Sequence, residues 1–254
     1  MALTINTNMA SINAQHALAG ATKSMNTAIE KLTTGYKINS AKDDAAGLAV
    51  ATKMQVKLSS VAVAEQNVQL GNSLMDTIEG NYEVIQSHLQ RIRDLTEQAA
   101  NGTYATDSRV AIQTEITQRF EEISRVANST EYNGMYLICE DDTAAGRINN
   151  FKDDGLTLQV GITAGEESII TMEESLFAAC SASGLLSKAD ATELANFAKE
   201  CAGFDSTSDE MDVSKARAAL TTIDAAIQNI TDRTTVLGSV QNQLVMLFKY
   251  KVTT

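Results

Sequence analysis

The sequence contains no proline and no tryptophan, and its aromatic residues make up only 5% of the chain. Proline ends or kinks helices, so its complete absence is typical of long unbroken ones. Large aromatic side chains fill much of a thick globular core. With few of them, and with many alanines and medium-sized aliphatic residues, the composition predicts thin apolar seams between packed helices.

Ligands for a metal and residues for catalysis are also scarce. The only histidines and cysteines are His16, His88, Cys139, Cys180 and Cys201. They are widely spaced and form no CxxC pair, whereas structural zinc sites cluster their ligands, so no metal site is expected. There is no Gly-rich phosphate loop, HExxH or GxSxG motif. We therefore expect no cofactor and rank an enzyme below a structural or binding protein. A disulfide between Cys180 and Cys201 would form if their segments lie in contact. The preferred interpretation is that both are free cysteines acting as small apolar residues.

Positive charge is in deficit, with 32 acidic and 20 basic residues and a net charge of −12. Such a surface repels nucleic acid and anionic membranes. No run of 18 apolar residues occurs, so membrane insertion is not expected. The N-terminus lacks a basic region followed by an apolar core and is not a Sec-type signal peptide. These absences favour a cytoplasmic protein, or one exported by a route that recognises a signal other than a Sec-type peptide.

What the sequence does contain is heptad periodicity. A long helix is predicted from Asp43 to about Ala99, capped by Ser40 or Asp43. At 1.5 Å per residue it would be roughly 80 Å long, which favours a rod. Its second half carries an apolar seam interrupted only by Thr96, formed by Met75, Ile78, Tyr82, Ile85, Leu89, Ile92 and Ala99.

Other segments supply partners for this helix. Residues 4–36 have a seam of small and medium side chains that includes Leu18, Met25 and Leu32; this helix should be marginal alone and end at residues 33–35. Residues 105–129, with Asp107 as a candidate cap, should form an antiparallel helix. From residue 213 the heptad returns at Ala216, Leu220, Ile223, Ile227, Ile230, Thr234, Leu237 and Leu244.

The segment between residues 138 and 212 has a different texture. Two short alternating stretches, residues 156–160 and 168–171, predict a β-hairpin, and residues 173–203 look helical without a long seam. We read 138–212 as an insertion. The predicted fold is therefore mainly α: an elongated, rod-like helical bundle with a small β-hairpin-containing insertion. Its divisions are a terminal helix and linker (1–42), the N-terminal part of the rod (43–137), the insertion (138–212), the C-terminal helix (213–244) and a tail (245–254).

Periodicity alone leaves two function classes open: a self-assembling structural subunit and a helical binding or adaptor protein. The alternating charges of residues 90–95 are read, on periodicity alone, as a solvated helix face with local ion pairs.

Long stretches of the sequence closely resemble bacterial flagellins. They are Ile5–Asn8, Ala28–Ala49, Leu89–Leu95, Glu115–Phe120, Glu131–Gly134, Leu156–Gly165, Leu220–Ile227 and Leu237–Leu244. The resemblance covers roughly residues 1–137 and 213–244, whereas residues 172–212 match nothing familiar. The dense match through Asn39–Ala49 and Gln90–Leu95 favours a flagellin over a hook–filament junction protein, which shares the terminal architecture.

The resemblance implies a structural subunit of the extracellular flagellar filament, self-assembling after type III export and serving motility. Its implied partners are other flagellin subunits, an export chaperone and cap proteins. Members of the family keep their terminal regions disordered until assembly, which fits a weakly stable first helix. The implied assembly seam comprises Leu18, Met25, Leu32, Leu237 and Leu244.

The resemblance also implies recognition by the innate receptor Toll-like receptor 5. In recognised flagellins an arginine, a leucine four residues later and a glutamate on the neighbouring helix dominate the contact. They correspond here to Arg91, Leu95 and Glu115, and spacing of four places the first two on one helix face. Asp94 is shorter than the family's usual glutamate, and residues 96–97 are more polar than expected.

The largest departure is Val245–Thr254, which does not resemble the family's long C-terminal helix. A frameshift or early stop would produce such a tail, and a divergent natural terminus is the other interpretation. Without the usual partner helix, residues 1–36 keep an unmated seam. The expectation from sequence is poor or no homopolymerisation, so a secreted, non-polymerising flagellin-like protein that acts as a receptor ligand is a second alternative.

Overall fold

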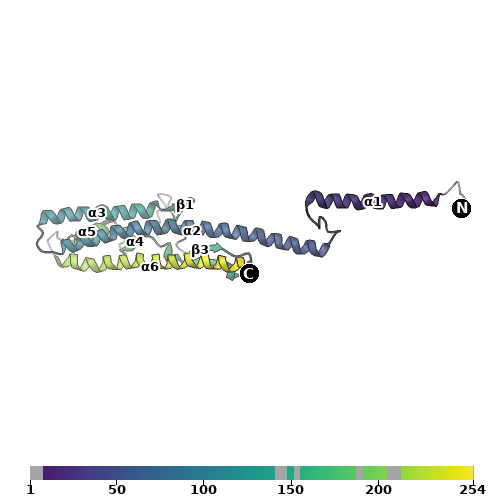
Figure 1. Ribbon diagram of the computed structural model, residues 1–254. Coiled ribbons are helices and arrows are strands. Elements are labelled where there is room, and N and C mark those ends of the chain that lie inside the picture. Colours follow the sequence, from purple (N-terminus) through teal and green to yellow (C-terminus); the bar gives the residue numbers. More distant parts are fainter. Residues whose placement is uncertain (1–7, 141–147, 152–154, 187–190, 205–212, 254) are drawn as a thin grey trace. The chain divides into compact units, whose positions relative to one another are not determined.

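The computed structural model describes residues 8–140, 148–151, 155–186, 191–204 and 213–253. The chain divides into two units, residues 1–60 and 61–254. Long helices dominate both units, and two small antiparallel hairpins lie in the second. The predicted mainly α class, with a small β-hairpin, is confirmed (Figure 1).

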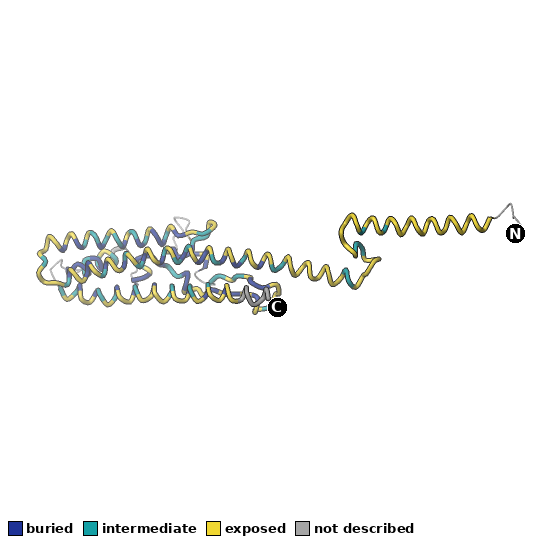
Figure 2. The backbone as a smooth tube through the Cα atoms, in the orientation of Figure 1, coloured by how far each residue is buried: buried dark blue, intermediate teal, exposed yellow. Residues whose placement is uncertain are grey.

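The first unit contains α1 (Met9–Thr34) and the first turns of α2 (Ala45–Ala99). The Asn8 side chain caps α1 by accepting a hydrogen bond from the Ser11 amide at 3.2 Å. The helix ends where the sequence predicts because Gly35 adopts φ 73°, and its N–H bonds to the Lys31 carbonyl. Not one residue of α1 is buried (Figure 2), so the described residues of this unit leave its apolar side chains uncovered.

The loop before α2 is ordered by two neighbouring aspartates. Asp44 Oδ1 accepts the Gly47 amide proton at 2.9 Å and so caps α2, which corrects the prediction of Ser40 or Asp43. Asp43 Oδ2 instead accepts from the Asn39 and Ser40 amides and from the Ser40 hydroxyl. Three donors converge on one carboxylate, so Asp43 holds the loop that precedes the helix.

The second unit is built on three helices that lie side by side: the rest of α2, α3 (Thr106–Ser129) and α6 (Val213–Thr253) (Figure 1). Every residue of the predicted α2 seam is buried, which confirms the heptad reading. Thr96, its polar interruption, is also fully buried. Its hydroxyl donates to the Ile92 carbonyl at 2.8 Å, so the polar group is satisfied within its own helix.

The predicted helices at 105–129 and from residue 213 are confirmed, with local corrections. α3 buries Ile112, Ile116, Phe120, Ile123 and Ala127, but Ala105 occupies the N-cap position and Asp107 makes no side-chain cap. In α6 the buried face includes Ala219 and Ala226, whereas the predicted Leu220, Ile227 and Thr234 are only partly buried. Small residues at these positions allow close approach of the packed helices.

Two hairpins complete the second unit. β1 (Glu131–Tyr132) and β2 (Met135–Tyr136) pair around Asn133 and Gly134, whose φ angles of 51° and 78° are those of a tight hairpin turn. The predicted hairpin is confirmed as β3 (Leu156–Gln159) and β4 (Ile169–Met172), with η1 (Glu166–Ser168) between them. Asn67 on α2 donates to the Gln159 carbonyl at 3.0 Å, and Leu158 lies against the bare backbone of Gly71.

The segment predicted as helical over residues 173–203 is helical only in part. It contains η2 (Glu174–Leu176), the short α4 (Ala182–Leu185) and α5 (Ala191–Cys201). Residues throughout it join the core cluster shared with α2, α3 and α6, among them Leu176, Phe177, Cys180, Phe197 and Cys201. The described part of 138–212 therefore completes the core and does not merely decorate it.

Polar side chains from α2 and α6 hold this segment. The Tyr82 hydroxyl donates to the Leu176 carbonyl, and Arg233 Nη1 donates to the Ala178 carbonyl at 2.8 Å and to Cys180 Sγ at 2.9 Å. Burial raises the pKa of the Tyr82 hydroxyl, which keeps it protonated as a donor, and also raises the pKa of the Cys180 thiol. All three cysteines are buried, and no disulfide joins Cys180 to Cys201.

Candidate functional site

A cluster of charged side chains joins α2 to α3 on the surface of the second unit. Arg91 meets Glu115 through two hydrogen bonds, Nε to Oε1 at 2.9 Å and Nη2 to Oε2 at 3.3 Å. Arg119, one turn after Glu115, donates to Oε1 of the same carboxylate at 3.2 Å. Its Nη1 also lies 3.2 Å from His88 Nδ1 on α2. We call Arg91, Glu115, Arg119 and His88 the charged cluster.

Within the charged cluster, the pairing of Arg91 with Glu115 favours the ionised form of both side chains. The hydrogen bond from Arg91 lowers the pKa of Glu115, and that pairing raises the pKa of Arg91. Arg91 and Glu115 remain 47% and 35% exposed, so the pair adds little to stability and stays accessible to a partner.

The neighbouring Arg93 points the other way, toward α6. Its Nε lies 2.7 Å from Asp224 Oδ1, and its Nη1 lies 3.3 Å from Glu97 within α2. Two arginines two positions apart thus join α2 to two different helices. The local ion pairs predicted for residues 90–95 exist only at Arg93–Glu97, and the other pairs bridge helices.

Leu95 is not on the accessible surface beside Arg91. It is 2% exposed and belongs to the core cluster. A step of four residues turns a helix by about 40° beyond a full turn, which is enough to carry a side chain from the surface into the seam. Of the three residues predicted for receptor binding, Arg91 and Glu115 are therefore accessible in this structure, whereas Leu95 is buried.

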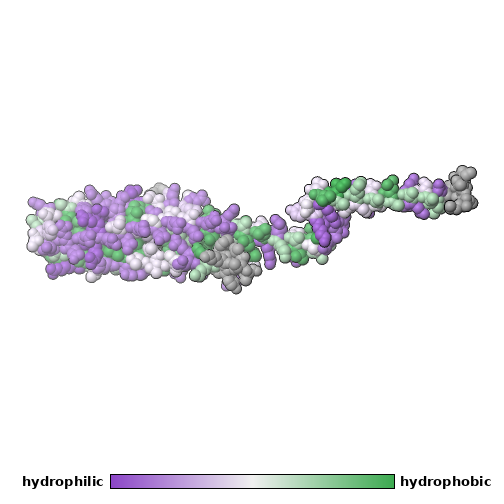
Figure 3. Space-filling view, in the orientation of Figure 1, coloured by the Kyte–Doolittle hydropathy of each residue, from purple (hydrophilic) through white to green (hydrophobic). Residues whose placement is uncertain are grey.

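The residues of the predicted assembly seam fall into two environments. Leu18, Met25 and Leu32 are 68%, 57% and 82% exposed on α1, where Figure 3 shows apolar side chains along the surface of the helix. Leu237 and Leu244 are fully buried in the core of the second unit. We call Leu18, Met25 and Leu32 the α1 face; of the five predicted seam residues, these three are the exposed ones.

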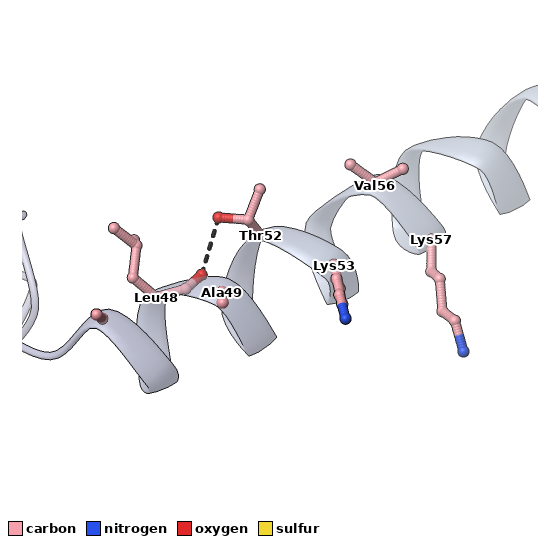
Figure 4. A pocket seen from close by; sticks show the side chains of 7 residues that line it. Leu48, Ala49, Thr52, Lys53, Val56 and Lys57 are labelled. Carbon is pink, nitrogen blue, oxygen red and sulfur yellow. Dashed lines mark hydrogen bonds between the residues drawn. The ribbon is translucent and has the colours of Figure 1, made fainter. Parts of the chain in front are cut away.

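A shallow apolar groove follows the first turns of α2 (Figure 4). Leu48, Ala49, Thr52 and Val56 line it, together with the stems of Lys53 and Lys57. The Thr52 hydroxyl donates to the Leu48 carbonyl at 2.9 Å, which removes its polarity from the groove. The first unit therefore exposes apolar surface on both of its helices.

Sequence reasoning missed two members of the charged cluster, His88 and Arg119. The spacing of Glu115 and Arg119 signals a pair within one helix, but nothing in the sequence shows that both face α2. Elsewhere among the described residues, no three His, Cys, Asp or Glu side chains gather as a metal site would require. No helix in the described ranges is long and apolar enough to cross a membrane.

Comparison with known proteins identifies the family. A protein-family model described as "bacterial flagellin N-terminal helical region" matches residues 5–143, which is more than half of the chain. The chain belongs to the bacterial flagellins. It is 40% identical over 174 residues to a flagellin of Salmonella muenchen, and 38% identical over 174 residues to flagellin D of Vibrio cholerae. Each match covers 68% of this flagellin chain but only 32% and 43% of those relatives, so the chain spans less than half their length.

Solved structures agree on the fold. The crystal structure of Bacillus cereus flagellin gives a TM-score of 0.51 at 22% identity, over 73% of this chain and 88% of that one. A putative flagellar hook-associated protein from Vibrio parahaemolyticus gives 0.64 at 18% identity, over 84% and 94%. Because both proteins have the same fold at low identity, the fold alone does not separate a filament subunit from a junction protein.

Proposed function

We propose that this flagellin is a structural subunit of the extracellular flagellar filament and that its partners are other flagellin subunits. The observation that carries the proposal is the α1 face. Burying one large aliphatic side chain contributes about 1.5–3 kcal/mol, and the α1 face exposes three of them on a helix without a buried residue. A helix of another subunit packed there would gain that energy.

The geometry of such a contact favours a fibre. A face on one subunit that meets a different face on the next makes a heterologous contact, and such contacts build open helices when the rotation does not close. Because an isolated helix gains little stability in water, packing would also order α1 at the moment of assembly. Type III export, with an export chaperone and cap proteins as partners, accompanies this role.

The proposal is tested by sedimentation of the labelled chain with preformed flagellin filament seeds. A filament subunit adds to the seeds in successive layers, so pelleted label increases with the amount of chain supplied. A hook–filament junction protein would instead saturate after a limited layer. A chain that stays in the supernatant with seeds present would refute the filament role. The remaining alternative would then be a secreted, non-polymerising receptor ligand.

A second candidate function is recognition by Toll-like receptor 5, which the exposed pair Arg91–Glu115 favours. A half-exposed arginine held by a carboxylate on the adjacent helix presents a fixed donor group to a partner. The proposal does not use Leu95 as a direct contact, because this residue is only 2% exposed.

We expect Arg91→Ala to reduce receptor activation by roughly tenfold or more, as loss of one charge-assisted contact predicts. A reporter-cell assay measures the activation. The matched control is Arg125→Ala, which removes an exposed arginine paired with Glu122 within α3. Equal activation by Arg91→Ala and the unsubstituted chain would exclude this site.

A further inference from the structure

The contact between His88 and Arg119 fixes the protonation state of the histidine. A guanidinium has five donors and no acceptor, so Arg119 Nη1 can only donate. His88 Nδ1, 3.2 Å away, must therefore carry a lone pair, and the ring proton is on Nε2. The contact exists only while the imidazole is neutral.

The surroundings of His88 oppose its protonation. α3 faces it with Arg119, Glu122 and Arg125, two cations against one carboxylate, and Glu122 is itself engaged by Arg125. On α2 the nearest charged residue in sequence is Arg91, which pairs with Glu115. Partial burial, followed by the charge of Arg119, lowers the pKa of His88 below its ordinary value.

We propose that His88 makes the α2–α3 contact acid-sensitive: protonation removes the acceptor of Arg119 and sets two cations against each other in the charged cluster. Arg119 then keeps only Glu115 as its partner. This inference is independent of the proposed filament role, because it concerns the fold of the second unit alone.

The direction of the pH effect follows from linkage. Between the ordinary histidine pKa and the lower one in the folded chain, the unfolded state binds more protons than the folded state. The free energy of unfolding therefore rises with pH across that interval. The contribution of neutral His88 to stability is lost as pH falls through the folded-state pKa. Above the ordinary value both states are neutral and His88 contributes no pH dependence.

The experiment is an NMR titration of the full chain labelled with carbon-13 at the histidine ring. The chain has two histidines, and His16→Asn removes the other signal and so assigns His88. We expect His88 to titrate below the ordinary value of about 6.5, and Arg119→Gln to move it upward. Titration of His88 at or above the ordinary value, or no response to Arg119→Gln, overturns the proposal.

Thermal unfolding gives a second test that does not depend on Arg119→Gln folding. His88→Asn retains an acceptor for Arg119 at every pH. When the pH is lowered from about 7.5 to about 5.5, the range in which histidine changes charge, the Tm of the unsubstituted chain should decrease more than that of His88→Asn. His16→Asn, altered on the exposed α1, should behave as the unsubstituted chain does. Equal losses in all three chains would contradict the inference.

Discussion

Arg109→Met is expected to lower the free energy of unfolding of the second unit by about 3–5 kcal/mol. Arg109 is completely buried, and among the described residues its guanidinium is surrounded by backbone carbonyls. Nε donates to Tyr104 at 3.2 Å and Nη2 to Asn101 at 2.9 Å, while Nη1 donates to Ala99 and, at 3.3 Å, to Ala202. Methionine keeps the apolar stem but leaves all four carbonyls without these donors.

The physical reason lies in the helix ends that Arg109 joins. Ala99 is the last residue of α2 and Ala202 follows the last residue of α5. Carbonyls at helix C-termini lack partners within the helix and carry partial negative charge, which a buried cation satisfies. Gly203, at φ 78°, leaves the space that the guanidinium occupies, because a Cβ there would meet Nη1.

Urea unfolding followed by the near-ultraviolet circular dichroism of tyrosine measures the effect, since Tyr82 is buried in this core. The free energy of unfolding of Arg109→Lys should lie between those of Arg109→Met and the unsubstituted chain, because an ammonium keeps the charge but not the planar, five-donor geometry of the guanidinium. Arg125→Met, at an exposed arginine, should change stability by no more than about 0.5 kcal/mol. A loss for Arg109→Met as small as that of the control would show that the carbonyl network is not stabilising.

Phe177→Ala should destabilise the second unit by about 3–5 kcal/mol, the range for truncating a buried aromatic residue. Phe177 is fully buried, and its ring centroid lies 4.9 Å from that of Phe151. Its carbonyl also accepts a hydrogen bond from the buried Asn149 side chain. The effect would be small if residues 138–204 only decorated the helices, so the substitution tests whether this segment belongs to the core.

The same urea experiment measures this prediction. Glu174→Ala, three residues earlier and exposed, is the matched control and should stay within about 0.5 kcal/mol of the unsubstituted chain. Similar stabilities for Phe177→Ala and Glu174→Ala would mean that the segment folds independently of α2, α3 and α6.

Periodicity predicted the helices well because their apolar residues repeat over many turns. The seam from Met75 to Ala99 and the end of α1 at Gly35 are local properties, which the sequence states directly. The buried face of α6 was harder to predict from the sequence. Ala219 and Ala226 are buried because the helices pack closely there, which composition does not reveal.

Contacts between distant segments were beyond sequence reasoning. The carbonyl of Ala202 that Arg109 binds lies 93 residues away, and the Tyr82–Leu176 bond joins residues 94 apart. The same limit applies to the candidate site. Spacing placed Leu95 near Arg91 on the helix but did not show where the core begins, and His88 entered the charged cluster only once α3 was in place.

The central claim is that the α1 face drives incorporation into filaments, and paired variants in the seeded sedimentation experiment test it most directly. Leu18→Asp with Met25→Asp adds two charges on that face, whereas Asn13→Asp with Ser24→Asp adds two charges on exposed polar positions of the same helix. Losing the burial of two large side chains should reduce incorporation by roughly tenfold or more, while the control pair should incorporate like the unsubstituted chain. Equal incorporation of the two double variants would contradict the account.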